Sequence, residues 1–391
     1  MNMEVNVFRI ENLVELSATY RLYRVKGLLR WEPDSEVKER RKLQQDYYRN
    51  LRSLVGRLSR ELRSPVTFLE QQEVPYLVVR EDGALPKSEY PVIGCKVYLE
   101  RGVQVLNLDF AHLDEKTMPI ALRFLQFSLQ GALKKNHDLW QPCTGHPFFE
   151  KAGMSVGRGI QLHRGMSVRA VELDGGGIGL CVDVRHRYIS ANPLPAKLDR
   201  RGFQHHKMSH VIYRMGHYWF EIRLAEWSEL SVTELKVPDE DRDRNLLEFL
   251  HKHCEKPLPP ELVLLPKDCA VVHYYNSRKE LRAAPSVLCY PVVEPGNVRF
   301  RGEAARTQLA PSVRRSRIAA VVTKYFSKLG FGGRDLRLAR HPHQIRARHF
   351  PIPDLKFGNG KTLDFEIEVR EGLLIPEGRF PRLLGPVLQD Q

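Results

Sequence analysis

The stretch HVIYRMGHYWFEIRL, residues 210–224, brings aromatic rings, histidines and arginines close together in the sequence. Aromatic rings stack on nucleobases of any type, and arginine attracts backbone phosphates without reading base sequence. The alternation from residue 218 onward predicts a half-buried strand. The residues expected on its core face are Phe220, Ile222 and Leu224. Tyr213, Arg214 and His217 are then expected to line the open edge of this unit, where they would contact nucleic acid.

Arginines are also expected to gather beside a second pair of strands. The segments SVRAVEL and IGLCVDVRHRYIS flank residues 174–177, and the glycines between them predict a hairpin turn. No helical pattern follows, which disfavours a phosphate-binding glycine loop. The strand that enters this hairpin brings Arg158, Arg164 and Arg169 near one another, and we predict that they contact nucleic acid.

The most basic part of the chain is residues 301–350, which hold twelve Lys or Arg residues and two acidic residues. Apolar residues at helical spacing predict a helix over residues 311–329, with Gly330 as its C-cap. A basic stripe adjoins the apolar face, and unbalanced positive charge attracts phosphates. The side chains predicted to follow a nucleic-acid backbone are Arg314, Arg315, Arg317, Lys324 and Lys328.

A nuclease is the competing interpretation of the carboxyl-terminal region. The stretch PDLKFGNGKTLDFEIEVR, residues 353–370, loosely resembles nucleases that hold Mg²⁺ between two carboxylates and activate water with a lysine. Asp354 and Glu368 are the candidate ligands, but Arg370 stands where the lysine is needed and does not deprotonate. Apolar alternation from residue 363 to 369 explains these charges as the outer face of a strand, so we expect no catalytic residue on this chain.

Metal and membrane sites are not expected. The histidines considered as zinc ligands are His205, His206, His210, His251 and His253. Their HH and HxH pairs lack a second pair of ligands at zinc spacing. The six cysteines are scattered without a CxxC pair, which is typical of reduced thiols in the cytosol. No signal-peptide pattern and no membrane-length apolar run is present. These features predict a cytoplasmic protein without a metal, a cofactor or a membrane contact on this chain.

Composition and periodicity indicate several domains. The chain has 391 residues and a net charge of +14, which favours a polyanionic partner. Helical spacing predicts a long helix over residues 35–63, with an apolar stripe from Tyr47 to Leu62, and a second helix over residues 117–136. Strand patterns occupy much of the remainder. The expected fold class is multidomain α/β, of the α+β kind, with mixed sheets, long helices and a small β-rich unit.

The order of these features resembles the amino-terminal half of Argonaute proteins. The residues that stand where the family's first linker has its characteristic positions are Phe148-Phe149, Gly159, Ser167-Val168-Arg169 and Asp183. The stretch LPPELVLLPKDCAVVHYYNSRKELRAAPSVLCYPVVE is similar to the end of a PAZ domain, although the family's glutamate is missing from residues 284–289. AARTQLAPSVRRSRI and FPIPDLKFGNG are similar to the two ends of the second linker.

This resemblance implies a domain order. The expected units are an N domain (1–140), linker 1 (141–199), a reduced PAZ-like, β-barrel-like domain (200–295) and linker 2 (296–391). The chain reaches Gln391 where the family's MID domain would begin, so MID and PIWI, with the nuclease centre and any divalent cation, are expected on a separate chain. The apolar, proline-punctuated tail over residues 371–391 is expected to dock on that partner.

The resemblance also implies a role for the rings, because PAZ domains hold the 3′ end of a guide strand. The candidates here are Tyr213, Arg214, His217, Tyr218, Trp219, Tyr274 and Tyr275. The implied function is a non-catalytic half of an Argonaute-type complex in prokaryotic defence. It would clamp the duplex of guide and target nucleic acid beside a separate MID-PIWI protein. Two alternatives stay open: a metal-dependent nuclease using Asp354 and Glu368, and a basic scaffold that binds an acidic protein.

Overall fold

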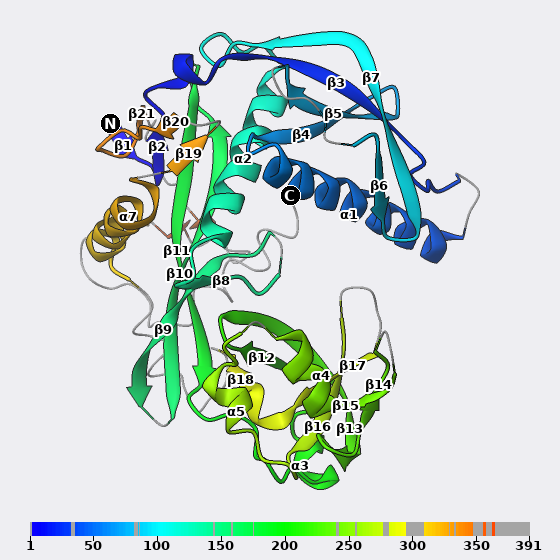
Figure 1. Ribbon diagram of the computed structural model, residues 1–391. Coiled ribbons are helices and arrows are strands. Elements are labelled where there is room, and N and C mark those ends of the chain that lie inside the picture. Colours follow the sequence, from blue (N-terminus) through cyan, green and yellow to red (C-terminus); the bar gives the residue numbers. More distant parts are fainter. Residues whose placement is uncertain are drawn as a thin grey trace. The chain divides into compact units, whose positions relative to one another are not determined.

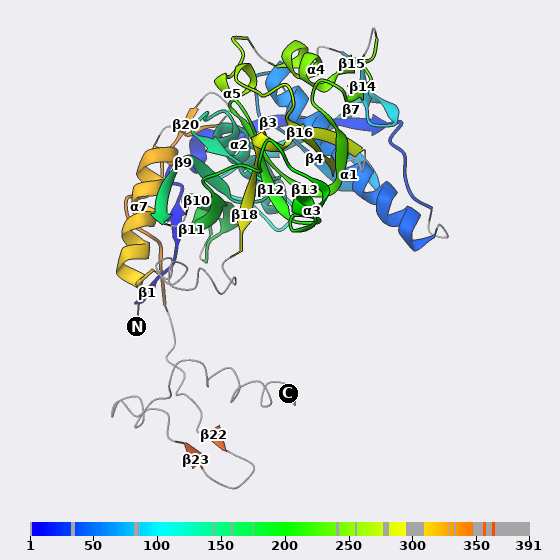
Figure 2. The same cartoon turned by 90° about the horizontal axis from the view of Figure 1, so that it is seen from below.

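A computed structural model describes residues 2–32, 36–81, 85, 87–143, 145–157, 159–174, 176–239, 242–254, 256–276, 281–294, 309–327, 329–331, 334–346, 355–356 and 362–363. The chain forms two units, one of Asn6–His343 and one of Met1–Val5 with Gln344–Gln391. In the second unit, β1 (Asn2–Glu4) pairs with β21 (Gln344–Arg346), and β22 (Leu355–Lys356) pairs with β23 (Thr362–Leu363; Figure 2).

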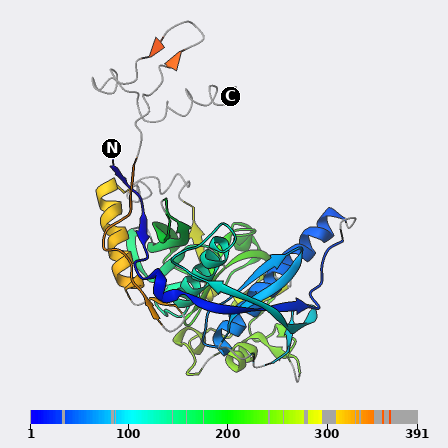
Figure 3. The same ribbon diagram turned by 90° about the horizontal axis from the view of Figure 1, so that it is seen from above.

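A five-stranded antiparallel sheet occupies the first part of the larger unit, in the order β4-β5-β3-β7-β6 (Figures 1 and 3). Its strands are β3 (Ala18–Lys26), β4 (Val66–Gln71), β5 (Val74–Arg80), β6 (Glu89–Val92) and β7 (Cys95–Leu108). Helix α1 (Val37–Glu61) packs on this sheet through the predicted apolar stripe, of which Tyr47, Leu51 and Leu58 are fully buried. The long helix predicted from its periodicity is therefore confirmed.

Helix α2 (Met118–Lys134) joins this sheet to the next one. Pro119 stands in its first turn, where proline is tolerated because the first backbone N–H groups have no partner in the helix. Phe124, Leu125 and Leu129 are completely buried in a core shared with residues of both sheets. The second predicted helix is thus confirmed, and it fixes β4 and β10 on either side of one core.

A ten-stranded sheet continues the fold in the order β17-β16-β13-β12-β18-β11-β10-β9-β8, with β2 also paired to β11. The strands of its first half are β2 (Val7–Arg9), β8 (Leu139–Trp140), β9 (Phe148–Gly157), β10 (Ile160–Glu172) and β11 (Ile178–Ser190). The short 3-10 helix η1 (Leu13–Leu16) follows β2. Strands β10 and β11 pair over their whole length, so the predicted hairpin around residues 174–177 is confirmed.

Only glycine fits at position 165 of β10, because β9 lies too close for a side chain. A Cβ there would lie 2.4 Å from the Phe148 carbonyl oxygen of β9, closer than real contacts allow. The β9–β10 register also shifts between His163 and Gly165. The glycine therefore permits the close backbone approach that an irregular strand pair requires.

The smaller β-rich region contains the rest of that sheet and several short helices. Its strands are β12 (His210–Met215), β13 (Tyr218–Ser231), β14 (Lys236–Val237), β15 (Arg244–Asn245), β16 (Ala270–Tyr275), β17 (Leu281–Pro285) and β18 (Cys289–Val293). Its helices are α3 (Arg200–Gln204), α4 (Leu246–His253), α5 (Pro260–Val263) and the 3-10 helix η2 (Ser286–Leu288). A separate hydrophobic core, including Leu224, Val272 and Cys289, holds this region together.

Helix α7 (Pro311–Phe326) lies against β11 (Figure 1). It is shorter than predicted, because Leu329 and Gly330 belong to β19 (Leu329–Phe331), which pairs with β20 (Arg334–Leu336). The expectation of a C-cap at Gly330 was therefore wrong. Ile318 and Phe326 of α7 are buried in the core that contains α2. Phe331 of β19 packs edge-on against Phe124, with ring centroids 6.4 Å apart, so the chain after the helix follows tertiary packing that the local sequence does not encode.

The molecule is a multidomain α+β protein, as predicted. All six cysteines are free thiols. Among the described residues, no helix has both the length and the apolar character needed to cross a membrane.

Candidate nucleic-acid interface

Tyr213 lies in the core of the β-rich region, and its predicted place at an open edge was wrong. Its side chain is 3% exposed, and its ring packs edge-on against Phe220, with centroids 5.0 Å apart. Burial raises the pKa of Tyr213 well above its ordinary value. The physical reason is register: Tyr213 is the cross-strand partner of Phe220, and directly paired residues share a face of the sheet.

The core face of β13 is close to that predicted from alternation. Ile222 and Leu224 are buried, while Phe220 is partly buried at the boundary of the same core. Tyr274 is also nearly buried and packs against Tyr213, with ring centroids 6.2 Å apart. Residues 213 and 274 therefore contribute mainly to folding.

Arg214 is stacked between two aromatic rings. Its guanidinium carbon lies 4.0 Å from the centre of Trp219 and 3.8 Å from that of Tyr290. Burial lowers the pKa of Arg214 to about 10, and its Nε and Nη2 atoms have no hydrogen-bond partner among the described residues. Trp219 is itself held by Trp140, with ring centroids 6.1 Å apart. This arrangement joins β12 and β13 to β8 by cation–π and ring contacts.

Three predicted rings remain at the surface. Tyr218 is 47% exposed and Tyr275 is 54% exposed. His217 stands in the turn between β12 and β13, and its ring centroid lies 4.0 Å from that of Tyr218. These side chains keep the exposure that stacking on a base requires.

The structure does not bring the three predicted hairpin arginines together. Arg164 and Arg169 are exposed on β10, opposite His186 and Cys181 of β11. Arg158 lies outside the described residues. The five-residue separation along β10 puts Arg164 and Arg169 on opposite faces of the strand, because side chains alternate.

The basic residues of α7 mostly face the sheet. Arg314 forms an ion pair with Asp183 of β11 at 2.6 Å, and Lys324 forms one with Glu150 of β9 at 2.7 Å. Arg317 donates to Nε2 of His186 at 3.2 Å. Arg315 is exposed, and Lys328 lies outside the described residues. The charge of the predicted stripe is therefore partly neutralised by residues that its sequence could not reveal.

A cleft of about 1920 Å³ gathers positive charge that sequence reasoning missed. Seven basic side chains line it, from α1, the turn after α1, and the end of α2: Lys42, Arg49, Arg52, Arg60, Arg63, Lys134 and Lys135. Arg49 pairs with Asp46, but the other six form no ion pair with a described residue. Glu221, the second acidic residue of the lining, is paired with Arg187 at 2.5 Å. The cleft therefore has excess positive charge.

Aromatic and apolar groups form the remaining lining of this cleft. Tyr274 and Tyr275 of β16 line it together with Phe220 and Ile222 of β13, and Tyr48 lines it from α1. Two of the predicted rings, Tyr274 and Tyr275, thus border the same cavity as the missed cations. The available sequence signal was the spacing of Lys42, Arg49, Arg52 and Arg60, which recur on the side of α1 opposite its apolar stripe.

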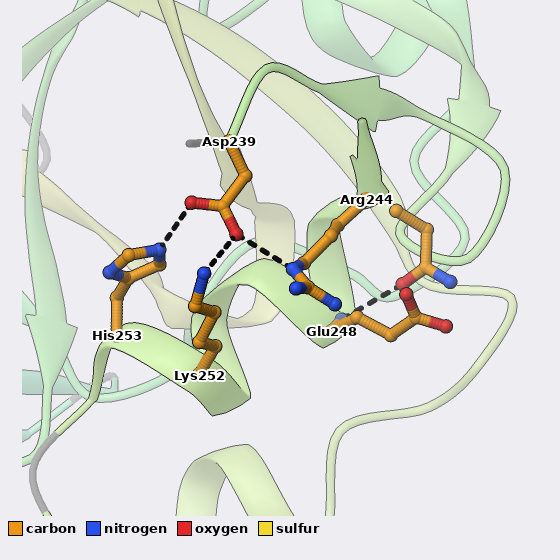
Figure 4. A network of polar contacts seen from close by, with 6 residues as sticks. Asp239, Arg244, Glu248, Lys252 and His253 are labelled. Atoms are coloured by element: carbon orange, nitrogen blue, oxygen red, sulfur yellow. Dashed lines mark hydrogen bonds and ion pairs between the residues drawn. The ribbon is translucent and has the colours of Figure 1, made fainter. Parts of the chain in front are cut away.

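A buried carboxylate holds the α4 segment of the β-rich region (Figure 4). The Asp239 side chain is 2% exposed and accepts hydrogen bonds from Arg244 at 2.7 Å, Lys252 at 2.8 Å and His253 at 2.9 Å. The helix begins at Asn245, whose side chain accepts from the Glu248 backbone N–H at 2.8 Å. These contacts attach α4 and β15 to the loop that carries Asp239.

The structure describes only some of the residues considered for a nuclease centre, a docking tail or a zinc site. Asp354 and Glu368 lie outside the described residues, as does the tail over residues 371–391. The histidines considered for zinc have other partners: His210 pairs with Glu221 at 2.8 Å, and His251 contacts the Leu262 carbonyl at 3.3 Å. In the described part of the chain, no three His, Cys, Asp or Glu side chains are grouped to hold a metal ion.

Solved structures with a similar fold are Argonaute and Piwi proteins. Drosophila Piwi aligns with a TM-score of 0.50 and 13% identity, over 88% of this chain and 43% of Piwi. The Argonaute of Methanocaldococcus jannaschii, solved with guide DNA, aligns with a TM-score of 0.50 and 10% identity, over 93% of this chain and 45% of that one. Aa-Ago, solved with externally bound siRNA, aligns with a TM-score of 0.50 and 15% identity, over 93% of this chain and 47% of Aa-Ago.

The likeness establishes the fold. No protein-family model matches the sequence, and no curated protein matches it either. The chain spans less than half the length of the structures it resembles. The predicted resemblance to the amino-terminal half of an Argonaute is confirmed as a resemblance of fold.

Proposed function

We propose that this chain is a nucleic-acid-binding half of an Argonaute-type complex, which clamps a guide–target duplex without cutting it. The observation that carries the proposal is the cleft of about 1920 Å³. Its lining combines rings of β13 and β16 with cations of α1 and α2, most of which form no ion pair with a described residue. Cations attract phosphates of any sequence, and rings stack on any base. This chemistry suits a protein that holds many different guides.

The partner is the second part of the proposal. A chain that spans less than half of an Argonaute fold would act with a separate MID-PIWI protein, which would supply the nuclease centre and any divalent cation. The complex would serve prokaryotic defence. Co-expression with a neighbouring MID-PIWI protein should give a stable complex of equal stoichiometry on a sizing column. Elution of two separate monomers would contradict the partnership.

Removal of cleft charge tests nucleic-acid binding. Arg52→Gln with Arg60→Gln should weaken the binding of single strands of every sequence alike, because both exposed side chains line the cleft. The slope of log affinity against log salt should fall by about 1.4 if two phosphate contacts are lost. Fluorescence anisotropy over a salt series would measure both quantities.

The matched control removes two charges from the same helix outside the cleft. Lys38→Gln with Arg41→Gln changes exposed side chains of α1 that do not line it, so affinity and slope should change much less. Equal losses in both variants would mean that net charge alone drives binding. Mg²⁺-dependent cleavage by the purified chain, abolished by Asp354→Asn, would instead support the nuclease.

A further inference from the structure

A second cavity, of about 310 Å³, lies between α7 and the β10–β11 hairpin. Its volume is at the lower end of the range for small-ligand sites, about 300–1,000 Å³. The charged side chains that line it are Arg164, Arg185, Arg317, Lys324 and Glu150. Four of these are cations and one is a carboxylate, so an anion is the ligand that this lining favours.

Two guanidinium groups from different elements carry most of the uncompensated charge. Arg164 extends from β10, and its Nη2 lies 3.9 Å from the sulfur of Met154. Arg317 extends from α7, and burial together with the charge of Arg164 lowers the pKa of Arg317. Neither arginine forms an ion pair with a carboxylate among the described residues. Like charges held close together in this way are stabilised when an anion lies between them.

His186 contributes a neutral ring to the same cavity. Arginine has no acceptor, so the 3.2 Å contact from Arg317 requires Nε2 of His186 to accept. Burial and the charges of Arg317 and Arg164 lower the pKa of His186, which agrees with a neutral ring. His186 thus orients one N–H of Arg317 and leaves its other donors available.

The carboxylate in the lining is already engaged. Glu150 accepts from Lys324 Nζ at 2.7 Å and from the Tyr325 hydroxyl at 2.6 Å. Burial tends to raise the pKa of Glu150, but the hydrogen bonds from Lys324 and Tyr325 outweigh it and keep that pKa below its ordinary value. The charge of Arg164 also lowers the pKa of Glu150, so this one carboxylate stands against the four cations that line the cavity.

We propose that this cavity binds one phosphate group of a nucleic-acid backbone between Arg164 and Arg317. Guanidinium groups suit this ligand because their fixed fork of N–H donors matches phosphate oxygens. The phosphate would join α7 to the hairpin, two elements far apart in the sequence. The choice of a nucleic-acid phosphate rests on the proposed function, whereas the anion site itself rests on the cavity.

Thermal unfolding of the full chain with inorganic phosphate tests the anion site. Phosphate should raise the unfolding temperature in a saturable way, because a ligand that binds only the folded state stabilises it. Ala320→Glu places a carboxylate at the cavity on an exposed helical position and should abolish the effect. Ala319→Glu, the same change at the adjacent exposed position outside the cavity, should keep it. An equal response in the two variants would overturn the proposal.

A double substitution tests the two guanidinium groups. Arg164→Gln with Arg317→Gln should raise the phosphate dissociation constant by about tenfold to a hundredfold. Lys38→Gln with Arg41→Gln removes two exposed charges of α1 that line neither cavity and should leave the constant nearly unchanged. Circular dichroism without phosphate would verify the fold of each variant. A similar loss in both would mean that phosphate responds only to net charge.

Competition identifies the source of the phosphate. A short single-stranded oligonucleotide should raise the apparent dissociation constant for inorganic phosphate in the wild-type chain, and equally in Ala319→Glu, which keeps the phosphate response. Independent binding of the two ligands would overturn the assignment to a nucleic-acid backbone. If oligonucleotide binding fails altogether while the phosphate response persists, the proposed function fails and the anion site stands. If phosphate has no saturable effect while oligonucleotides bind in the cleft, only the present inference fails.

Discussion

Arg314 of α7 donates to a single oxygen of Asp183 on β11 from two nitrogens, Nε at 3.2 Å and Nη2 at 2.6 Å. Asp183 also lies 3.3 Å from Arg185 of its own strand. One carboxylate therefore attaches the helix to the hairpin and neutralises a charge that the sequence analysis assigned to phosphate. Arg317, one turn along the same helix, meets a neutral histidine instead and keeps its charge uncompensated.

Arg314→Gln should act on stability more than on binding. The side chain is 47% exposed, so the loss of the ion pair should cost about 0.2–1 kcal/mol of unfolding free energy. Oligonucleotide affinity should change far less than in Arg52→Gln, because Asp183 already neutralises Arg314. Urea unfolding and anisotropy would measure the two effects. A binding loss as large as that of Arg52→Gln would show that Arg314 leaves Asp183 for a phosphate.

Tyr213→Ala should destabilise the β-rich region strongly. Its ring is fully enclosed by Phe220, Tyr274 and their neighbours, so truncation should cost about 3–5 kcal/mol, as for other buried aromatic residues. Tyr213→Phe should change stability little, since the Tyr213 hydroxyl donates only weakly, to the Met215 sulfur at 3.8 Å. Denaturant unfolding of both variants would decide. A near-neutral Tyr213→Ala would show that the ring is not part of the core.

Phe220→Ala should combine a smaller folding effect with a binding effect. Phe220 is only partly buried and lines the basic cleft beside Tyr275. The loss of stability should therefore be smaller than for Tyr213→Ala. Loss of one stacking partner should weaken oligonucleotide binding by about 1–3 kcal/mol. Unchanged affinity in a folded Phe220→Ala variant would exclude this ring from the interface.

Elements with strong local periodicity could be predicted from the sequence. Leu51, Leu54 and Leu58 recur at helical spacing, and that spacing decides which face of α1 is buried. The glycines near residues 174–177 permitted the turn between β10 and β11. The order of such elements along the chain also indicated the Argonaute-like fold. The helical spacing and the turn glycines act within short segments, so these elements can be predicted without knowledge of their distant partners.

The interface depended on distant partners and was predicted less well. Tyr213 resembles an exposed ring until β12 is registered against β13, which places it opposite Phe220. The cations of α1 gain significance only when the fold sets them across a cleft from β16. Arg314 attaches the helix to the hairpin, because it donates to Asp183, which is 131 residues away in the sequence. Such pairings are consequences of the tertiary structure, and no spacing rule in one segment encodes them.

Asp239→Ala should loosen the α4 segment. The carboxylate is 2% exposed and accepts from Arg244, Lys252 and His253 (Figure 4), and hydrogen bonds to charged groups are worth about 1.5–3 kcal/mol each when buried. We expect faster amide hydrogen exchange in residues 244–253, with the β10–β11 hairpin unaffected. Lys252→Met removes one of the more exposed partners and should have a smaller effect. Equal exchange rates in wild type and Asp239→Ala would contradict this role.

The pH dependence of stability should reflect one buried and two half-buried histidines. Burial, the largest cause in each case, lowers the pKa of His163, His186 and His206 below the ordinary value of 6.5. Below pH 6.5 the unfolded chain therefore binds protons that the folded chain does not. The free energy of unfolding should fall as the pH is lowered from about 7.5 to 5. Carboxylates with a lowered pKa, such as Asp109 at about 2, add their effect only at lower pH.

His163→Asn should reduce this slope. Nδ1 of His163 donates to the Glu150 carbonyl at 2.9 Å, while Nε2 is buried without a hydrogen-bond partner in the described part of the chain, so a proton on Nε2 would have no acceptor. His163 should contribute up to about 1.4 kcal/mol per pH unit below 6.5. The asparagine amide can replace Nδ1 but does not titrate. The exposed His146→Asn serves as the control and should keep the wild-type slope. If urea unfolding at several pH values gave the same slope for His163→Asn as for wild type, His163 would not be the residue that resists protonation in the folded chain.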